Sequence, residues 1–556
     1  MDNRRLILLL IFSFSIVMLW DAWQKHGQPK SAVAPATQAG VAGTAQGTSG
    51  ISGSPGLPGA VPTPTATPGA AAGAESVPGT AAKVDTGAKA TVRTDLYVAE
   101  IVALGGDLVR LELSKHPDTN DKSKPFLLFD NGERHVYLGQ SGIIGEGLPN
   151  HKTVWTLQPG EHALKDGEQE LRLTLQAPGR GGNKVSKTYV FHRGSYEIEL
   201  IQEGAPAGAM AYYQITRDGK PAEGGGGDMM MGVSTFTGPA VYTDGEKFQK
   251  VEFSDIEKGK AKFASKADNG WLALVQHYFV AAWLPPAKVE REYFMRKLGD
   301  NLYSAGVILP VAADGKSVMM LYAGPQEQNK LEQIAPGLEL VVDYGWLTMI
   351  AAPLFWILGM IHKLTGNWGW SIIGLTVLIK AAFFPLSAAS YKSMAKMKVL
   401  TPKLMKLKET FGDDKQRLNQ EMMELYKREK VNPLGGCLPI LVQIPVFIAL
   451  YWVLLGTVEM RNAPWLGWIA DLSVKDPYFV LPLIMGATMF IQTKLNPTPP
   501  DPIQAKVMLF MPIMFTGMFL FFPAGLVLYW TVNNVLSIAQ QWQITRMIES
   551  GEGSRK

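Results

Sequence analysis

A lysine stands inside a run of apolar residues, where a charge is costly. Lys380 lies in the segment from Ser371 to Pro385, which is otherwise apolar enough to enter a membrane. A lysine at the centre of a membrane span costs roughly 2.5 to 3.5 kcal/mol on insertion scales, so its presence indicates a function. Thr376 lies one helical turn earlier on the same face. The alternative is a side chain that snorkels to the nearer membrane surface, roughly 9 Å away along the helix.

The last apolar segment of the chain carries polar residues on one side of its expected helix. They recur at spacings of three and four residues, which places them on one helix face. They are Trp530, Asn533, Asn534, Ser537 and Gln541. Such a face is typical of the lining of a water-containing cavity, which Lys380 and Gln443 would share. Polar residues can also join membrane helices by hydrogen bonds, and a single asparagine would favour that alternative.

The apolar segment before the last one contains many methionines and phenylalanines. The residues are Met508, Met511, Met514, Met518, Phe515, Phe519 and Phe522. Because methionine is unbranched and polarizable, such a surface can contact many different apolar partners. Ordinary core packing is the alternative.

The sequence contains no pattern of an enzyme. Metalloprotease and nucleophile-elbow motifs are missing from the apolar half, and the glycines from Gly224 to Gly227 lack the lysine of a phosphate-binding loop. We therefore expect no catalytic residue, no cofactor and no metal. The net charge of +4 over 556 residues does not indicate direct DNA binding. Cys437 is the only cysteine, so no disulfide can form within the chain.

The N-terminus predicts a membrane anchor followed by a flexible linker. Arg4 and Arg5 precede an apolar run that ends near Trp20, and an Ala-x-Ala pattern at Ala32 lies too far from this run for ordinary signal cleavage. The stretch that follows, to about Ala90, consists mainly of Ala, Gly, Pro, Ser and Thr and cannot form a core. A binding tail is the alternative for this stretch.

Between about Val92 and Leu331 the apolar residues alternate with polar ones. Leu171, Leu173 and Leu175 show this period of two, which is typical of strands with one buried face. Turn pairs separate the runs, at Asn131-Gly132, Asp218-Gly219 and Asp244-Gly245. The pattern predicts a large antiparallel β-sandwich outside the membrane, and the apolar stretch from Trp271 to Leu284 is too short to span and is expected inside it.

The C-terminal half predicts five membrane spans. They are Trp368 to Leu386, Leu434 to Leu455, Tyr478 to Gln492, Val507 to Phe522 and Leu526 to Ile544. Between Lys392 and Lys430 there are eleven Lys and Arg against six Asp and Glu, so the positive-inside tendency places this loop in the cytoplasm. An odd number of spans must then precede it. We therefore expect Val341 to Ile361 to lie along the outer membrane surface as an amphipathic helix.

The basic loop itself predicts a hairpin of two helices. Apolar residues recur at helical spacing on both sides of Gly412, and Asp413 is expected to cap the second helix. The hairpin is either a docking surface or a merely solvated basic element. Its candidate residues are Lys396, Lys398, Asp413, Asp414 and Arg417.

These sequence patterns together predict an α-helical polytopic membrane protein with a periplasmic all-β domain. The expected units are an anchor helix at 1–23, a disordered linker at 24–91, the β-domain at 92–335 and the interfacial helix at 336–366. They continue with a second transmembrane helix at 367–388, the cytoplasmic hairpin at 389–433, transmembrane helices three to six at 434–546 and a short tail at 547–556.

Four segments resemble the YidC/Oxa-type membrane protein insertases. They are Tyr391 to Lys398, Gly412 to Arg417, Val431 to Pro439 and Phe522 to Tyr529. The order of anchor, linker and β-domain is similar to the Gram-negative form, whose periplasmic domain is a β-supersandwich. The resemblance implies five helices around a hydrophilic groove that is open to the cytoplasm and to lipid.

The resemblance also implies roles for single residues. Lys380 matches the groove cation of the family, which is usually an arginine, and Thr376 and Trp530 match residues that line the groove. An apolar slide for the entering segment is implied at Ile444, Phe447, Met514 and Met518.

The expected function is therefore insertion and folding of integral membrane proteins in the bacterial inner membrane. The implied partners are nascent membrane proteins, the Sec translocon, the phospholipid bilayer, and a ribosome or targeting receptor at the hairpin. Both termini are expected in the cytoplasm. A secondary transporter is a weaker hypothesis because the spans show no inverted repeat, and a simple anchor for the β-domain would not need the polar stripes.

Overall fold

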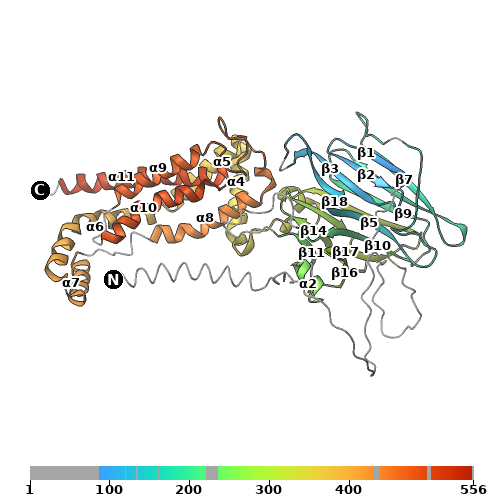
Figure 1. The fold of residues 1–556 in the computed structure, drawn as a ribbon, viewed down its shortest axis with the longest axis horizontal. Helices are drawn as coiled ribbons and strands as arrows, with labels where there is room; N and C mark the ends of the chain where they lie inside the picture. Colours follow the sequence, from blue (N-terminus) through green and yellow to red (C-terminus); the bar gives the residue numbers. More distant parts are fainter. Residues whose placement is uncertain are drawn as a thin grey trace, which may run out of the picture.

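The computed structural model describes residues 87–118, 121–132, 135–160, 162–220, 236–412, 414–429, 438–496 and 502–553. The anchor and most of the linker expected from the sequence lie outside these ranges. The described chain forms a β-domain and a helical bundle that lie end to end (Figure 1).

The β-domain consists of two nine-stranded sheets. The first contains, in spatial order, β1 (Lys89–Arg93), β2 (Tyr97–Val102), β3 (Leu108–Pro117), β4 (Pro125–Asn131), β5 (Val136–Ile144), β10 (Met210–Asp218), β17 (Leu302–Pro310), β16 (Arg291–Gly299) and β13 (Lys266–Ala267). The second contains β12 (Lys247–Lys250), β11 (Gly238–Thr243), β14 (Trp271–Gln276), β15 (Phe279–Leu284), β18 (Lys316–Pro325), β9 (Glu197–Glu203), β8 (Lys184–His192), β7 (Glu170–Pro178) and β6 (Thr156–Leu157). Strand pairing in both sheets is antiparallel, as predicted.

The predicted alternation decides which residues fill the space between the sheets. In β7, Leu171, Leu173 and Leu175 are buried, whereas Arg172 between them is exposed. The stretch from Trp271 to Leu284 forms two buried strands, so it belongs to the core as expected. Burial of these side chains is the main force that holds the two sheets together.

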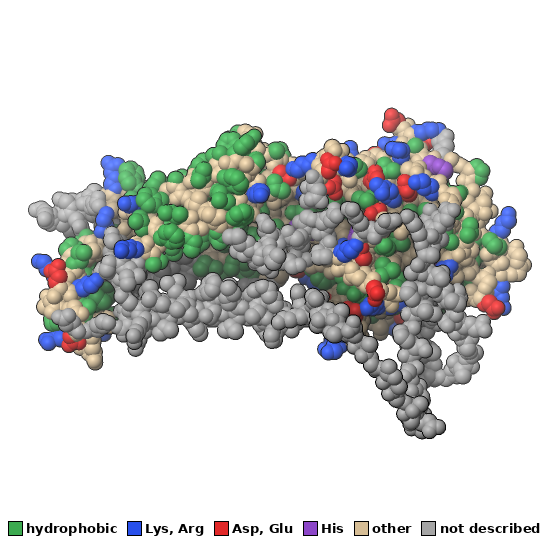
Figure 2. All heavy atoms as spheres, viewed as in Figure 1, with side chains coloured by type: hydrophobic (Ala, Val, Ile, Leu, Met, Phe, Trp, Pro, Cys, Tyr) green, Lys and Arg blue, Asp and Glu red, His purple; other side chains and the backbone are tan. Residues whose placement is uncertain are grey.

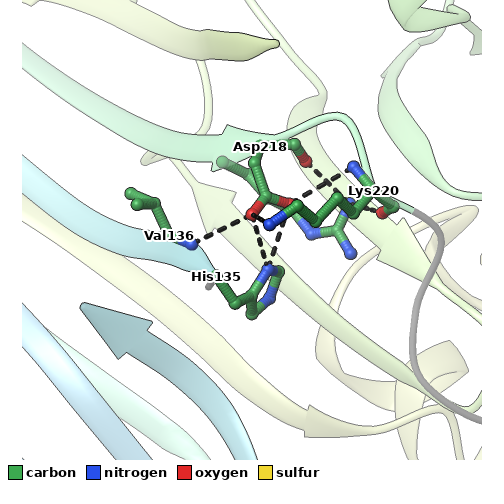
Figure 3. A network of polar contacts seen from close by, with 5 residues as sticks. His135, Val136, Asp218 and Lys220 are labelled. Atoms are coloured by element: carbon green, nitrogen blue, oxygen red, sulfur yellow. Dashed lines mark hydrogen bonds and ion pairs between the residues drawn. The ribbon is translucent and has the colours of Figure 1, made fainter. Parts of the chain in front are cut away.

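A polar network fixes the end of β10 against β5. The Asp218 carboxylate accepts hydrogen bonds from His135 Nδ1 at 2.9 Å and from the Val136 backbone at 3.1 Å, and it lies 3.8 Å from the Lys220 ammonium (Figure 3). The His135 contact holds the pKa of Asp218 below its usual value, against the opposing effect of burial. The network therefore holds the turn region after β10 to the neighbouring strand.

Short helices follow or interrupt the strands. They are η1 (Arg180–Gly182), α2 (Phe253–Glu257), α3 (Gln328–Ile334), η2 (Leu338–Val341) and η3 (Gly345–Leu347). The chain then enters the helical bundle, in which α4 lies at the end next to the β-domain and α6 and α7 lie at the opposite end (Figure 1).

The described part of the bundle contains eight long helices and one short helical turn. They are α4 (Thr348–Thr365), α5 (Trp368–Ala382), α6 (Phe384–Phe411), α7 (Lys415–Arg428), α8 (Leu438–Gly456), η5 (Val458–Met460), α9 (Val480–Leu495), α10 (Pro502–Phe519) and α11 (Ala524–Gly553). Each predicted span overlaps one helix, with ends that differ by several residues. The span expected to end at Leu386 is divided, since α5 ends at Ala382 and the chain bends by 66° into α6. Phe384 to Leu386 therefore begin the hairpin.

Among the described helices, α4 alone is both long and apolar enough to cross a membrane, and α5 with α6 would be a second span if the bent pair is counted as one. Length and composition do not distinguish a span from a surface helix. The position of α4 along the membrane surface therefore stays a prediction, as do the spans at the other helices.

Candidate functional site

Lys380 lies inside the helical bundle. Its side chain is on the last turn of α5 and the residue is only 4% exposed. The ammonium donates a hydrogen bond of 2.7 Å to Ser537 Oγ on α11, and Ser537 in turn donates to the Asn533 carbonyl. The side chain thus points between helices and does not reach solvent, contrary to what snorkelling would require.

The ammonium of Lys380 is held by the hydroxyl group of Ser537. Within the part of the chain that the structure describes, no carboxylate forms an ion pair with it. A buried ammonium without a paired carboxylate retains much of its attraction for an anion, because the effective dielectric constant inside a protein is lower than in water. The site can therefore attract an incoming carboxylate.

Three buried polar residues lie on α6, next to α11, and were missed by the sequence analysis. Ser387, Ser390 and Tyr391 are each less than a tenth exposed, and α6 packs against α11. Their spacing of three and four residues marks one helix face. This signal was present in the sequence, but these residues were assigned to the end of the span and the start of the hairpin.

The polar stripe of α11 divides between two neighbouring helices. Ser537 faces Lys380 on α5, whereas Asn534 Nδ2 donates to Thr488 Oγ1 at 3.3 Å on α9. Further along, Gln541 Nε2 donates to Asn496 Oδ1 at 3.1 Å, directly after α9. Asn534 and Gln541 therefore join α11 to α9, which is the alternative considered for this stripe.

Two other predicted groove residues lie apart from the Lys380 contact. Thr376 is buried and donates its hydroxyl to the Ile372 carbonyl of its own helix. Gln443 lies half-buried on α8, and no hydrogen bond joins it to Lys380 among the described residues. Of the predicted groove residues, the structure therefore brings Lys380 and Ser537 into direct contact.

Trp530 connects the polar stripe to the predicted apolar slide. Its ring packs against Phe447 of α8 with a centroid distance of 4.6 Å and against Phe519 of α10 at 5.6 Å. Phe447 and Met518 are half-buried, whereas Ile444 is 45% and Met514 53% exposed. The four slide candidates thus combine packed and exposed apolar surface on α8 and α10.

The basic hairpin is formed by α6 and α7 around a small core. Leu400, Leu404 and Leu425 are buried between the two helices, while Lys396 and Lys398 are exposed. Arg417 lies over the Phe411 ring at 5.1 Å.

The cap of α7 differs from the expected one. Asp414 is the residue before the helix, and its Oδ1 accepts hydrogen bonds from the backbone of Gln416 and Arg417 at 3.1 and 3.0 Å. The prediction that Asp413 caps the helix is therefore wrong by one residue, because α7 begins at Lys415, and Asp413 itself lies outside the described residues.

Apolar side chains cover the outside of the bundle between its two charged ends (Figure 2). Those on α9 and α10 that are more than a third exposed include Leu483, Ile484, Phe490, Ile491, Leu509, Phe510 and Ile513. An exposed apolar surface of this size is incompatible with water around the bundle and fits lipid. Fold and site together define a polytopic helical membrane protein that carries a large all-β domain.

Two family models match nearly all of the described chain. The YidC periplasmic domain matches residues 89–357, and the 60Kd inner membrane protein family matches residues 360–551. A relative from Aromatoleum aromaticum, named membrane protein insertase YidC, is 61% identical over 569 residues and covers 100% of both chains. One from Dechloromonas aromatica with the same name is 59% identical and covers 99% of this chain and 98% of its own. The chain therefore belongs to the YidC family of membrane protein insertases, a role that is not enzymatic.

Solved structures give weaker likenesses. The crystal structure of an active YidC insertase with its first transmembrane domain resolved is 16% identical, with a TM-score of 0.40, and the match covers 82% of this chain and 92% of that one. The structure of YidC from Thermotoga maritima is 13% identical with a TM-score of 0.34. Neither adds to the family assignment.

Proposed function

We propose that this chain inserts membrane proteins by drawing a short polar segment of the substrate into a groove beside Lys380. The ammonium attracts acidic residues of that segment. The apolar segment that follows then moves into lipid along the predicted slide of Ile444, Phe447, Met514 and Met518. Burial of the apolar segment in lipid supplies the free energy, and the membrane potential helps to move acidic tails, so that no nucleotide is needed.

The observation that carries this proposal is the surroundings of Lys380. The ammonium is buried, its hydrogen bond goes to a neutral hydroxyl, and no carboxylate pairs with it in the described part of the chain. A structural lysine in a bundle would be expected to find a carboxylate or to leave the apolar region, since an uncompensated buried charge is costly. A site kept for an acidic substrate group explains the absence of a fixed partner.

The adjacent apolar side chains support the second step. Trp530 contacts Phe447 and lies on α11 seven residues, about two helical turns, before Ser537, so the polar site and an apolar surface share one helix. In the proposed substrate, a polar tail comes before an apolar segment. The polar tail would meet the polar site, and the apolar segment would meet the apolar surface. The exposed Met514 side chain can adapt to different apolar segments, because methionine has little shape preference.

We further propose the partners and the orientation. The exposed cations of the hairpin, Lys396 and Lys398, favour contact with an acidic or nucleic-acid surface such as a translating ribosome, or with a targeting receptor. The Sec translocon is a second partner suggested by the family. The proposed location is the bacterial inner membrane, with both termini and the hairpin in the cytoplasm and the β-domain in the periplasm.

Site-specific photocrosslinking to stalled nascent chains tests the proposal. A photoreactive residue at Trp530 or Met518 should crosslink to a substrate whose apolar segment has just left the ribosome. The control is the same residue at Leu483, which is 60% exposed on α9 away from the Lys380 cluster. Equal crosslinking from Leu483 would contradict a defined path along α8 and α10.

A further inference from the structure

The segment between α8 and α9, here called the outer connection (residues 457–479), joins the bundle to the β-domain. On the bundle side its Leu472 carbonyl accepts a hydrogen bond from Gly525 at the start of α11, at 2.9 Å. Near α5, Asn367 Nδ2 donates to the Pro464 carbonyl at 3.0 Å, and a Cβ at Gly369 would overlap the Trp465 ring. The outer connection is therefore fixed to several helices at once.

Arg461 is the centre of its contact with the β-domain. The guanidinium donates a hydrogen bond of 2.6 Å to the Pro117 carbonyl at the end of β3. It also lies 5.4 Å from the ring centre of Phe126, 5.8 Å from that of Tyr278 and 5.5 Å from that of Phe279. A planar cation among three aromatic faces is a favourable arrangement, and more so when it is partly removed from water.

Two further contacts surround this centre and differ in character. Lys122 forms an ion pair of 3.1 Å with Asp471, but the lysine side chain is 56% exposed and such pairs contribute little. His277 donates through Nε2 to the Leu455 carbonyl at 2.9 Å. Leu455 is in the last turn of α8, where backbone carbonyls lack partners within the helix. The β-domain therefore completes the outer end of α8.

This end of α8 leads directly to the predicted slide. Phe447 lies eight residues before Leu455, about 12 Å along the helix axis, and there it contacts Trp530. Pro445 lies on the far side of Phe447, so the part of α8 from Phe447 outward is not interrupted by proline. A shift of the outer end of α8 would thus move Phe447 relative to Trp530.

We infer that Arg461 is a positioning residue, which docks the outer connection on the β-domain and thereby holds α8 in place for insertion. The inference rests on the proposed function, because it concerns the helix that carries half of the slide. The inference also gives the inner rim of the β-domain a part in insertion, because this rim contacts the outer connection and the end of α8. The inner rim consists of Pro117, Phe126 and the turn from His277 to Phe279.

Hydrogen exchange of the full chain in lipid nanodiscs, together with an insertion assay, tests this inference. Arg461→Ala should speed exchange in peptides covering residues 453–463 and 115–126 on the order of tenfold, and should lower insertion. Arg461→Lys keeps the charge but loses the planar fork, so it should give an intermediate result. Lys122→Ala is the matched control, because it removes a positive charge from the same interface and should change exchange less than about twofold.

Either of two results would overturn the inference. One is unchanged exchange at residues 453–463 in Arg461→Ala. The other is faster exchange with insertion at the wild-type rate, since docking would then not position α8 for function. Lys380→Ala in the same assay separates this inference from the proposed function. Normal insertion of an acidic-tail substrate by Lys380→Ala would refute the groove mechanism, whatever Arg461→Ala shows.

Discussion

At the scale of single residues, the proposed mechanism rests on the charge of Lys380 and on the apolar character of Met514 and Met518. Lys380 donates to Ser537, and this bond satisfies one of the three protons of the ammonium. In the proposed function, a substrate carboxylate is the further partner of this ammonium. The positive charge should therefore matter more than the shape of the side chain that carries it.

Lys380→Arg should support insertion well, whereas Lys380→Ala should fail for substrates whose translocated tails contain Asp or Glu. Two charges 4 Å apart attract by about 4 kcal/mol at an effective dielectric constant of about 20. Loss of even a third of this attraction lowers insertion of acidic tails by about tenfold. The measurement compares one substrate with an acidic tail and one with a neutralised tail.

Lys380→Ala should still fold, because removal of an unpaired buried charge removes a desolvation cost. Protease resistance of the purified protein checks this. Lys380→Glu should be worse than alanine for acidic tails, through repulsion in a poorly screened site. If Lys380→Ala inserts the acidic-tail substrate at the wild-type rate, the ammonium has no electrostatic part in insertion.

Replacement of Met514 and Met518 together by leucine should be tolerated, because leucine keeps the volume and the apolar character. Replacement of both by aspartate should reduce insertion of all substrates, since a charged slide cannot release an apolar segment into lipid. Ile513→Asp controls for general damage to α10. Ile513 is 63% exposed and lies about 100° from Met514 around the helix axis. Wild-type insertion by the double aspartate variant would refute the slide.

At the scale of elements, the sequence predicted the types of structure better than their limits. The period of two in β7 and the apolar runs of α8 to α11 sufficed to predict strands and helices, because burial decides both patterns. The order of the strands was not predictable. β10 pairs with β5 and β17, which are far from it in sequence, and local patterns do not encode such pairings.

The polar stripe of α11 shows the same limit for the site. Its spacing identified one helix face, but a face about 100° wide can contact two neighbours. Only the packing of α5 and α9 determines that Ser537 meets Lys380 while Asn534 meets Thr488. The buried serines of α6 were missed because the predicted span was extended to Leu386, past the bend after Ala382, although Pro385 in the first turn of α6 marks the start of a new helix.

The hairpin should be needed as a folded unit, and Leu425→Asp tests this. Leu425 packs against Leu400 and Leu404, so a carboxylate there should separate α7 from α6 and speed hydrogen exchange across residues 415–428. Insertion should fall while the amount of protein in the membrane stays constant, because the hairpin core is separate from that of the bundle.

Asn419→Asp is the control for this hairpin variant. It adds the same charge to the same helix at an exposed position, so it should leave both exchange and insertion near wild type. If Leu425→Asp opens the hairpin and insertion does not change, the hairpin is only a solvated basic element.

At the scale of the whole molecule, the β-domain and the bundle meet through contacts that the sequence could not indicate. The bond from Arg461 to Pro117 joins residues 344 positions apart, and the Lys122 to Asp471 pair joins residues 349 positions apart. The β-domain is in contact with the outer connection, and this contact contains a partly buried acid.

That acid is Glu459, in the first turn after α8. Its Oε2 is buried and accepts no hydrogen bond from the described residues. Burial raises the pKa of Glu459 to about 7, and the neighbouring Glu327 acts in the same direction. Backbone N–H groups and Lys330 oppose this shift but are weaker than burial. Tyr322 and Tyr344 are the other titratable groups close to it.

The contact between the two parts should weaken as the pH rises from about 5 to about 8. The folded protein binds a proton on Glu459 more tightly than the unfolded chain does, whose glutamate has a pKa near 4.5. The stability from this proton is therefore complete at low pH and is lost as the pH passes about 7. The thermal midpoint of the purified full chain should fall by roughly 5 °C over this range, and Glu459→Gln, which stays neutral, should remove most of the fall. Glu332→Gln, an exposed change on α3, should keep the wild-type dependence. If Glu459→Gln and the wild type lose the same stability between pH 5 and pH 8, Glu459 does not titrate in this contact.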